Sequence, residues 1–243
     1  MTSRQLSAAV IAAAALAGGL VLHAQQRPDP AAGDRVAALK QSLQQGLAKA
    51  RQYEWVETTV IRLNGEEKGR KQNRCYYGAD GKVQKVSLDQ PHEEAQDQGG
   101  GRGRGRVRKQ IIENKKDEMK DYMEKAAALI HQYVPPNPQQ IQMAKDAGHI
   151  VVNPQAGGKV RLVISQYLKP GDSLTIDLDP ATNSILGLGV NSYLDTKDDV
   201  VTLAVQMSSL PDGAIYAGQT TLDANAKKIA VVIQNSGHRP VQQ

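Results

Sequence analysis

The feature that most constrains the fold is an alternation of apolar and polar residues that recurs from His149 to the end of the chain. Val160, Leu162 and Ile164, for example, alternate with Arg161 and Ser165. The same period-2 pattern returns in four further segments: Leu174/Ile176/Leu178, Leu186/Leu188/Val190, Val201/Leu203/Val205/Met207 and Ile229/Val231/Ile233. Short turn-forming segments such as 169–172 and 210–213 separate these runs. Alternation with short turns predicts an antiparallel sheet with one apolar face.

Three further strands are expected before the middle of the chain. The segment 53–63 is rich in aromatic and β-branched residues, and the Asn64-Gly65 pair that follows is a hairpin signal. A second strand is predicted over 70–77, and Asp80-Gly81 leads into a third over 82–88. Together with the segments after His149, the chain is expected to form about ten strands.

Helices are predicted at 34–52, 109–133 and 138–147. The second has an apolar stripe at helical spacing and ends before Pro135-Pro136, and Asn137 is placed to cap the third. Three helices are too few to cover a flat sheet of this size, so the sheet should curl. The expected fold is α+β: a curled antiparallel half-barrel sheet of about ten strands with three helices on its concave face.

The first residues predict export from the cytoplasm. Arg4 precedes an uninterrupted run of Ala, Val, Ile, Leu and Gly from Ala8 to Leu22, and a small residue, Ala24, follows. These are the parts of a secretory signal peptide, so 1–24 are expected to be cleaved after Ala24 and 25–243 to form a single periplasmic or secreted domain. The alternative is an uncleaved anchor, although the run is short for a spanning helix.

The positive charge of the chain is concentrated in one segment. The net charge of the chain is +5. Six of its positive charges come from Arg4 and from a cluster made of Arg102, Arg104, Arg106, Arg108 and Lys109. Without these six residues, the rest of the chain carries a net charge of −1. A basic face of the kind that nucleic-acid-binding domains use is therefore not expected. The low-complexity segment 89–108 is predicted to be a disordered Arg/Gly-rich loop. Three readings stay open: a solvated linker, an arm that contacts an anionic membrane surface, and an RNA-binding arm, which export disfavours.

The sequence contains no catalytic motif. There is no GxSxG or HExxH pattern, and no group of ligands with the spacing of a known metal site. Cys75, the one cysteine, lies in a strand-like run and is expected to be a buried apolar residue. We therefore expect a protein without cofactor or metal that is not an enzyme, while catalytic groups that converge only in space stay an alternative.

The order of elements resembles one family. A helix, a β-meander, a helical insertion and a long run of hairpins behind a signal peptide are similar to the LolA/LolB/RseB type of periplasmic protein. The stretches SLTIDLDPATNSILGLGV (173–190) and LPDGAIYAGQTTLDANAKKIAVVIQNS (210–236) resemble the paired hairpins near the end of such chains. The resemblance implies a half-barrel that holds acyl chains or a lipoprotein segment, and it assigns no individual residue.

The leading functional hypothesis is an exported, non-enzymatic binding protein for an apolar or lipidic ligand, such as an acyl chain or a lipoprotein. The ligand would lie between the sheet and the second helix. The candidate lining residues are Trp55, Met119, Tyr122, Met123, Leu129, Leu186, Leu188, Val190, Leu203 and Val205. The alternative is a protein-interaction or regulatory module with a solid core and no ligand.

Overall fold

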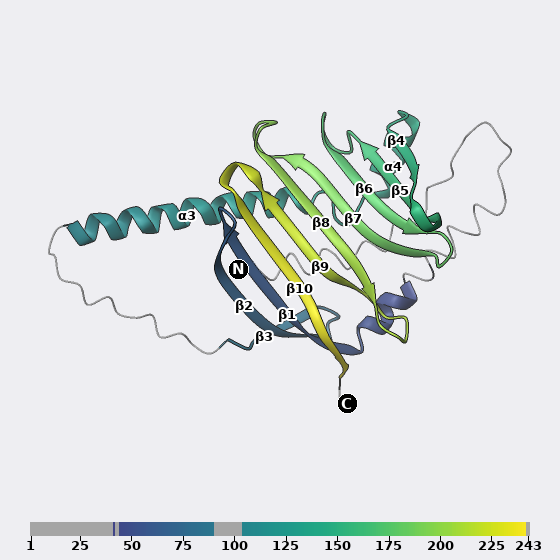
Figure 1. Ribbon diagram of the computed structural model, residues 1–243, viewed down its shortest axis with the longest axis horizontal. Helices are drawn as coiled ribbons and strands as arrows, with labels where there is room; N and C mark the ends of the chain where they lie inside the picture. The colour runs from purple at the N-terminus through teal and green to yellow at the C-terminus, as the bar shows by residue number, and fades with distance from the viewer. Residues whose placement is uncertain (1–40, 42–43, 90–103, 242–243) are drawn as a thin grey trace.

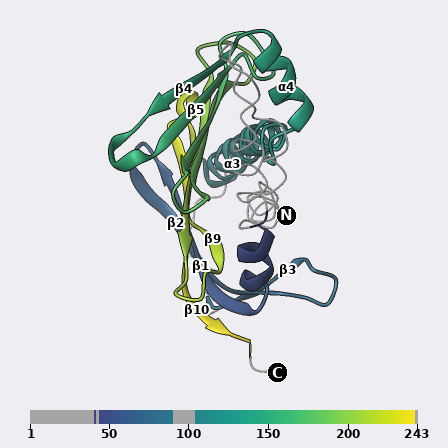
Figure 2. The same cartoon turned by 90° about the vertical axis from the view of Figure 1, so that its right-hand side faces the viewer.

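The computed structural model describes residues 41, 44–89 and 104–241. It shows one antiparallel sheet of ten strands with helices on one face, as the sequence predicts (Figures 1 and 2). The predicted signal peptide at 1–24 lies outside the described residues, as do 34–40 and 42–43 of the first predicted helix. No helix in the described part is long and apolar enough to span a membrane.

The sheet is open and consists of two antiparallel meanders, one of three strands and one of seven, that join side by side. Its spatial order is β3-β2-β1-β10-β9-β8-β7-β6-β5-β4, so β1 pairs with β10 and the sheet does not close into a barrel. Strands β3 and β4 form its two edges. The strands are β1 (Tyr53–Leu63), β2 (Glu66–Tyr77), β3 (Val83–Ser87), β4 (Ile150–Pro154), β5 (Val160–Ser165), β6 (Ser173–Asp179), β7 (Ser184–Tyr193), β8 (Val200–Ser209), β9 (Ile215–Ala224) and β10 (Ile229–Pro240).

The hairpin between β1 and β2 has the turn that its sequence predicts. Asn64 and Gly65 both adopt positive φ, at 53° and 82°. Two consecutive residues with positive φ define the type I′ turn, whose twist matches that of the flanking strands and which favours Asn followed by Gly. The turn thereby sets the register in which β1 and β2 pair.

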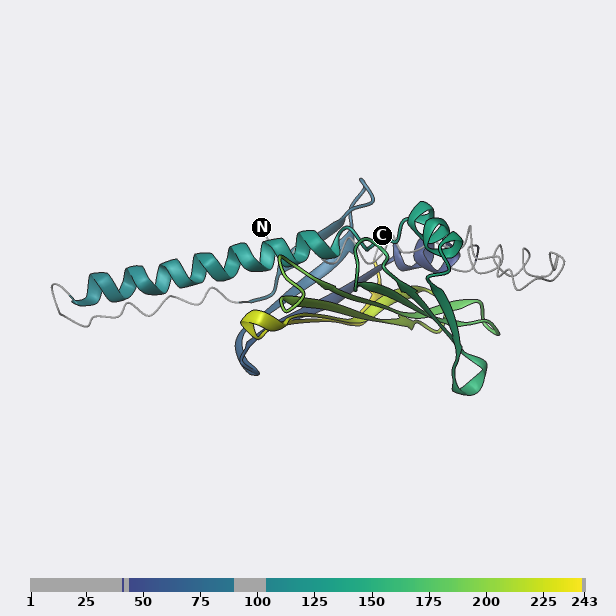
Figure 3. The ribbon, with the colours of Figure 1, turned by 90° about the horizontal axis from the view of Figure 1, so that it is seen from above.

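Three helices lie on the same side of the sheet (Figures 2 and 3). They are the helix 44–50, α3 (Arg104–Ile130) and α4 (Pro138–Asp146). The Asn137 side chain accepts a hydrogen bond from the backbone N–H of Gln139, which confirms the predicted cap of α4. Two short 3₁₀ helices, η2 (Ala156–Gly158) and η3 (Asn225–Lys227), lie in the hairpins β4–β5 and β9–β10.

Helix α3 differs from its prediction at both ends. It begins at Arg104, five residues before the expected start, so that part of the predicted loop is helical. Extending an existing helix costs little, and Arg and Gln are good helix formers, which offsets the cost of Gly105. The remainder of that loop, 90–103, lies outside the described residues. Figure 3 shows the N-terminal part of α3 reaching well past the edge of the sheet, whereas its C-terminal part lies over the sheet.

The core lies between the sheet and the C-terminal part of the helical layer. The helical side contributes Ala126, Leu129 and Ile130 from α3, and Ile141 and Ala144 from α4. The sheet side contributes apolar residues from strands β5 to β10. All of these side chains are buried. The helix-bearing face of the sheet is therefore the surface on which a ligand site is sought.

Candidate functional site

The helix-bearing face of the sheet is a continuous apolar surface. In an antiparallel sheet, directly paired residues point to the same face. One row of such partners crosses eight strands from β4 to β1: Val152, Leu162, Ile176, Leu188, Val205, Thr220, Ile233 and Thr59. A parallel row of Ile150, Ile164, Leu174, Val190, Leu203, Leu222 and Val231 reinforces it from β4 to β10. We call this surface, from β4 to β10, the apolar face.

Four of the predicted lining residues lie on this face. Leu188, Val190, Leu203 and Val205 are all buried and belong to the main core cluster. They come from the two central strands β7 and β8, which are directly paired. The alternation that identified them in the sequence therefore identified the correct face of both strands.

Leu186, unlike the other four predicted residues of β7 and β8, is not part of the buried apolar face. A β-bulge in β7 shifts the register, so that Leu178 pairs with Ile185 and the preceding Asp177 pairs with Gly187. Leu186 is the extra residue of the bulge. Ile185 joins the buried cluster in its place, and Leu186 is only partly buried. A bulge changes the side-chain period by one residue, and the continued alternation in the sequence conceals it.

The predicted lining residues of α3 differ in how deeply their side chains are buried. Leu129 is buried in the core, and Met123 is partly buried and packs against the core. Tyr122 and Met119, about two and three turns before Leu129, are partly exposed. Over its described side chains, α3 is therefore buried near its C-terminus and more exposed from Met123 back to Met119.

Polar contacts fix the C-terminal end of α3 to the sheet. The buried Tyr133 hydroxyl, three residues after α3, donates a 2.5 Å hydrogen bond to Asp172 Oδ2 and lies 2.8 Å from Ser192 Oγ. Burial, followed by the bond to Asp172, raises the pKa of Tyr133 well above its usual value, so this phenol stays protonated. Further along α3, the Tyr122 hydroxyl donates to Asp199 in the β7–β8 turn. Among the described residues, a buried hydrogen bond thus holds the chain just after α3, and a more exposed one holds the helix about two turns before its end.

The β1–β3 end of the helix-bearing face is polar and aromatic. Trp55, which was a predicted lining residue, is 7% exposed and donates from Nε1 to Asn235 Oδ1 at 3.0 Å. Its ring lies 5.6 Å from that of Tyr77 and 6.0 Å from that of His238. Trp55 is therefore not beside Leu188 and Val205 but several strands away, across β10 and β9. The predicted set thus forms two groups on the sheet.

A buried ion pair lies beside Trp55. Lys85 Nζ of β3 donates to both carboxylate oxygens of Glu57 of β1, at 2.6 and 2.7 Å, and both side chains are almost fully buried. Between them on β2 lies the fully buried Cys75, whose direct partners are Trp55 and Lys85. Burial, and then the nearby Glu57 carboxylate, raise the pKa of the Cys75 thiol to about 12, so this thiol is protonated and unreactive at neutral pH. The expectation that Cys75 is a buried apolar residue is confirmed.

Thr59 is the other unusual polar residue of this region. It lies two residues after Glu57 on the same face of β1 and is 7% exposed. Its hydroxyl has no hydrogen-bond partner among the described residues. Buried hydroxyls are normally satisfied, so each exception requires a physical account.

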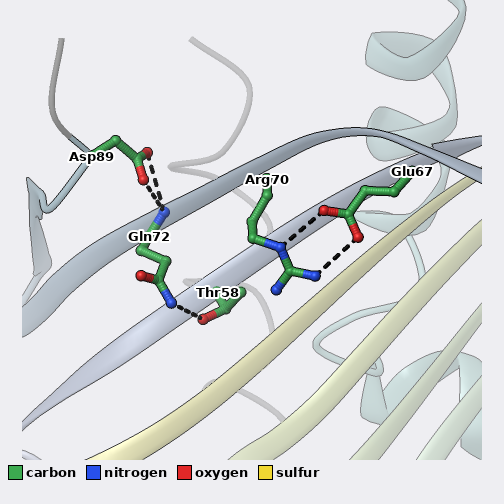
Figure 4. A network of polar contacts seen from close by, with 5 residues as sticks. All are labelled: Thr58, Glu67, Arg70, Gln72 and Asp89. Carbon is green, nitrogen blue, oxygen red and sulfur yellow. Dashed lines mark hydrogen bonds and ion pairs between the residues drawn. The ribbon is translucent and has the colours of Figure 1, made fainter. Parts of the chain in front are cut away.

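The opposite side of β1 and β2 has an ordinary surface network (Figure 4). Gln72 Nε2 donates to the hydroxyl of Thr58, and the backbone N–H of Gln72 donates to the Asp89 carboxylate at the end of the β2–β3 hairpin. Arg70 forms two parallel hydrogen bonds, both 2.9 Å, with Glu67. Thr58 and Thr59 are thus neighbours in sequence with opposite environments: one hydroxyl is engaged and the other is not.

The predicted anionic-surface residues lie at the start of α3. Arg104, Arg106, Arg108 and Lys109 fall within its first two turns, and Arg102 lies outside the described residues. Sequence reasoning missed Glu57, Lys85 and Thr59. No local signal marks them, because charged and Thr residues in a strand pattern usually indicate a solvent-facing side. Among the described residues, no group of three or more potential metal ligands is present.

Comparisons with known proteins give only distant likenesses. No family model matches the chain, and no curated protein matches it. Among solved structures, a DUF1329 family protein from Desulfovibrio piger is 11% identical, with a TM-score of 0.35 over 84% of this chain and 92% of that one. A LolA superfamily protein from Nitrosomonas europaea is 7% identical, with a TM-score of 0.33 over 82% and 94%.

The MucA/MucB complex structure of Pseudomonas aeruginosa is 12% identical, with a TM-score of 0.21 over 85% of this chain and 100% of that one. One of these neighbours is a protein of the LolA superfamily, a type that the order of predicted elements resembles. At these TM-scores the likeness carries nothing about ligand or partner.

Proposed function

We propose that this protein is a non-enzymatic binding protein that holds an apolar or lipidic ligand, such as an acyl chain, between the apolar face of the sheet and α3. One observation carries the proposal. The apolar face extends without a charged residue from β4 to β10, and among the described side chains of α3 those buried against it lie in the last turns, whereas Met119 and Met123 are only partly buried. A continuous apolar face whose covering helix is incompletely packed against it is suited to binding an apolar molecule.

The side chains of α3 support the same proposal. Met119 and Met123 are partly exposed on the helix that lies over the face. Methionine is flexible and polarizable, so it adapts to ligands of irregular shape. We infer that the turns of α3 before Tyr122 can move away from the sheet while the C-terminal end stays in place, because the described polar contacts to the sheet lie at Tyr122 and Tyr133.

The chemistry of the described side chains fits binding better than catalysis. The one cysteine is buried with a raised pKa. The buried Glu57 carboxylate is paired with Lys85. The proposed location is the periplasm or the exterior, on the strength of the N-terminal signal pattern in the sequence.

The test combines lipid analysis with a pair of variants. Protein purified from its own envelope should release acyl lipid on extraction, and the delipidated protein should bind a fluorescent acyl probe. Met123→Lys should weaken this binding by at least about tenfold, because the charge would be desolvated beneath the ligand. Met143→Lys is the matched control, because Met143 is 56% exposed on α4. If no lipid is released and no probe binds, the proposal is wrong.

The second candidate function is a protein-interaction module with a solid core. The open edge strand β4 favours it, because Val151, its second residue, is 51% exposed and the strand carries no charged residue. Such edges pair readily with an extended segment of another chain. This function would become the leading one if the lipid experiment fails, and Val151→Lys should then abolish binding of the partner.

A further inference from the structure

We propose that Thr59 hydrogen-bonds the polar head of the bound ligand, and that the ligand is a neutral amphiphile with hydroxyl or ester oxygens, such as an acylglycerol. This inference rests on the proposed function, because it assigns the head-group end of the same site. It combines three features of the β1 side of the helix-bearing face: its position in the register, the unpaired Thr59 hydroxyl and the adjoining ion pair.

The register places Thr59 at the polar end of the longest apolar row. Starting from Leu162 on β5, the row remains apolar through β8, and then reaches Thr220 on β9 and Thr59 on β1, with Ile233 of β10 between them. Neighbouring strands are about 4.8 Å apart, so the apolar part from Leu162 to Thr220 spans on the order of 20 Å. An acyl chain that lies along this row brings its head group to Thr220 and Thr59.

The Thr59 hydroxyl has the properties of a ligand contact. It is buried and has no partner among the described residues, which makes it costly to retain in an empty site. A hydroxyl both donates and accepts, so it can bond to an ester carbonyl or to a glycerol hydroxyl. Thr220, two strands away in the same row, is also buried and adds a second hydroxyl.

The ion pair disfavours a charged head group, and the β2 residue that is paired directly with Thr59, Lys71, is exposed. Glu57 lies two residues before Thr59 on the same face, and Lys85 donates to both of its carboxylate oxygens. A charged head placed here would compete with one member of this pair in a desolvated environment, which is energetically expensive. A neutral head bearing oxygen atoms leaves the pair intact and still finds a polar surface.

Two ligands and two variants test the inference. The ligands are monooctanoylglycerol and octane, which share an apolar chain but differ in the head group, and binding is measured by displacement of a fluorescent acyl probe. Thr59→Val removes the hydroxyl at nearly constant shape. Thr58→Val is the matched control, because the Thr58 hydroxyl is engaged by Gln72 on the opposite face (Figure 4).

We expect Thr59→Val to weaken binding of monooctanoylglycerol by about tenfold, the effect of one lost hydrogen bond, and to leave octane binding unchanged. Thr58→Val should change neither. If Thr59→Val binds the glyceride as tightly as the original protein, the head-group assignment is wrong, although octane binding would still support the proposed function. If neither ligand binds the original protein, the proposed function itself fails. Thermal unfolding of both variants controls for loss of structure.

The orientation of the ligand gives a second measurement. Trp55 is the only tryptophan of the chain and lies four residues before Thr59 on the same face of β1. Monoacylglycerols with bromine atoms near the head should quench its fluorescence more than those with bromine near the methyl end. The opposite order would place the head group at the β5 end and overturn the inference.

Discussion

At the residue scale, Gly46 shows how closely the first helix approaches the sheet. A Cβ atom at this position would lie 2.5 Å from Ile215 Cγ1 and 2.6 Å from its Cδ1. Ile215 is itself buried at the start of β9 and has little room to move. The absence of a side chain at Gly46 therefore permits the contact between the helix 44–50 and the sheet.

Gly46→Ala should accordingly destabilise the protein. Overpacking of this kind costs about 1–3 kcal/mol in the free energy of unfolding, which denaturant titration measures. Gly69→Ala is the control, because Gly69 has no atom within 4 Å of the new Cβ and no positive φ. That substitution should be neutral or slightly stabilising. Equal stability of the two variants would show that the helix does not pack at this distance.

The same scale shows what sequence reasoning can identify. Residues such as Leu188 and Leu203 were found because alternation reports directly on which face a side chain occupies. Glu57 and Thr59 were not found, because their burial depends on the partners that β2, β3 and β10 bring to them. A charge in an alternating strand indicates a solvent-facing side unless an opposite charge, here Lys85, arrives from a strand distant in sequence.

At the element scale, the Glu57–Lys85 pair joins β1 to the edge strand β3 across β2. Removing one partner of a buried ion pair leaves an uncompensated charge, whereas replacing both with apolar residues is often tolerated. The pair therefore fixes the position of β3 in addition to shaping the polar end of the face.

Lys85→Met should lower the free energy of unfolding by about 3–5 kcal/mol, because it removes the opposite charge and the two hydrogen bonds that Lys85 supplies to the buried Glu57 carboxylate. The double variant Glu57→Leu/Lys85→Met should recover most of this loss, and urea unfolding of the three proteins measures it. A single variant as stable as the original protein would show that the pair contributes nothing to stability. A double variant as unstable as the single one would show that packing, rather than charge, sets the cost.

Element boundaries were harder to predict than element types. The turn residues Asn64-Gly65 and the cap Asn137 placed their turn and helix correctly, because their backbone preferences are local. The start of α3 was placed too late, because Gly-rich composition indicates a loop while helix propagation from an established segment costs little. The bulge at Leu186 was missed for a related reason: its local sequence is compatible with an unbroken strand.

At the scale of the whole molecule, the apolar–polar pattern of the sequence predicted the fold class, but it did not predict the order of the strands in the sheet. Ten strands, antiparallel pairing and three helices are expected from alternation, turns and helical stripes. The pairing of β1 with β10 joins residues far apart in sequence, such as Thr59 and Ile233, and no local signal specifies it. That one pairing brings the polar end of the sheet against the apolar face, and so creates the amphipathic surface on which the proposed site depends.

The long helix α3 gives the molecule a second possible contact, with an anionic membrane surface. Its 27 residues correspond to about 40 Å, and its N-terminal part, which includes Arg104, Arg106 and Arg108, reaches past the sheet (Figure 1). Basic residues near an anionic membrane contribute about 1 kcal/mol each, and the attraction is screened by salt. A helix that both covers the ligand and contacts the membrane would place the binding face at the lipid surface.

We therefore expect the protein to sediment with anionic vesicles at low salt and to be released as salt is raised. Replacing Arg102, Arg104, Arg106 and Arg108 with Gln, which retains helix propensity, should abolish sedimentation and leave thermal stability nearly unchanged. Matched replacement of Lys227 and Lys228, two basic residues in the β9–β10 hairpin, is the control and should have little effect. Sedimentation that survives the four arginine replacements would assign the arm to a linker role. A protein that never sediments with anionic vesicles would rule out the membrane contact, while acyl binding at the apolar face would stand on its own test.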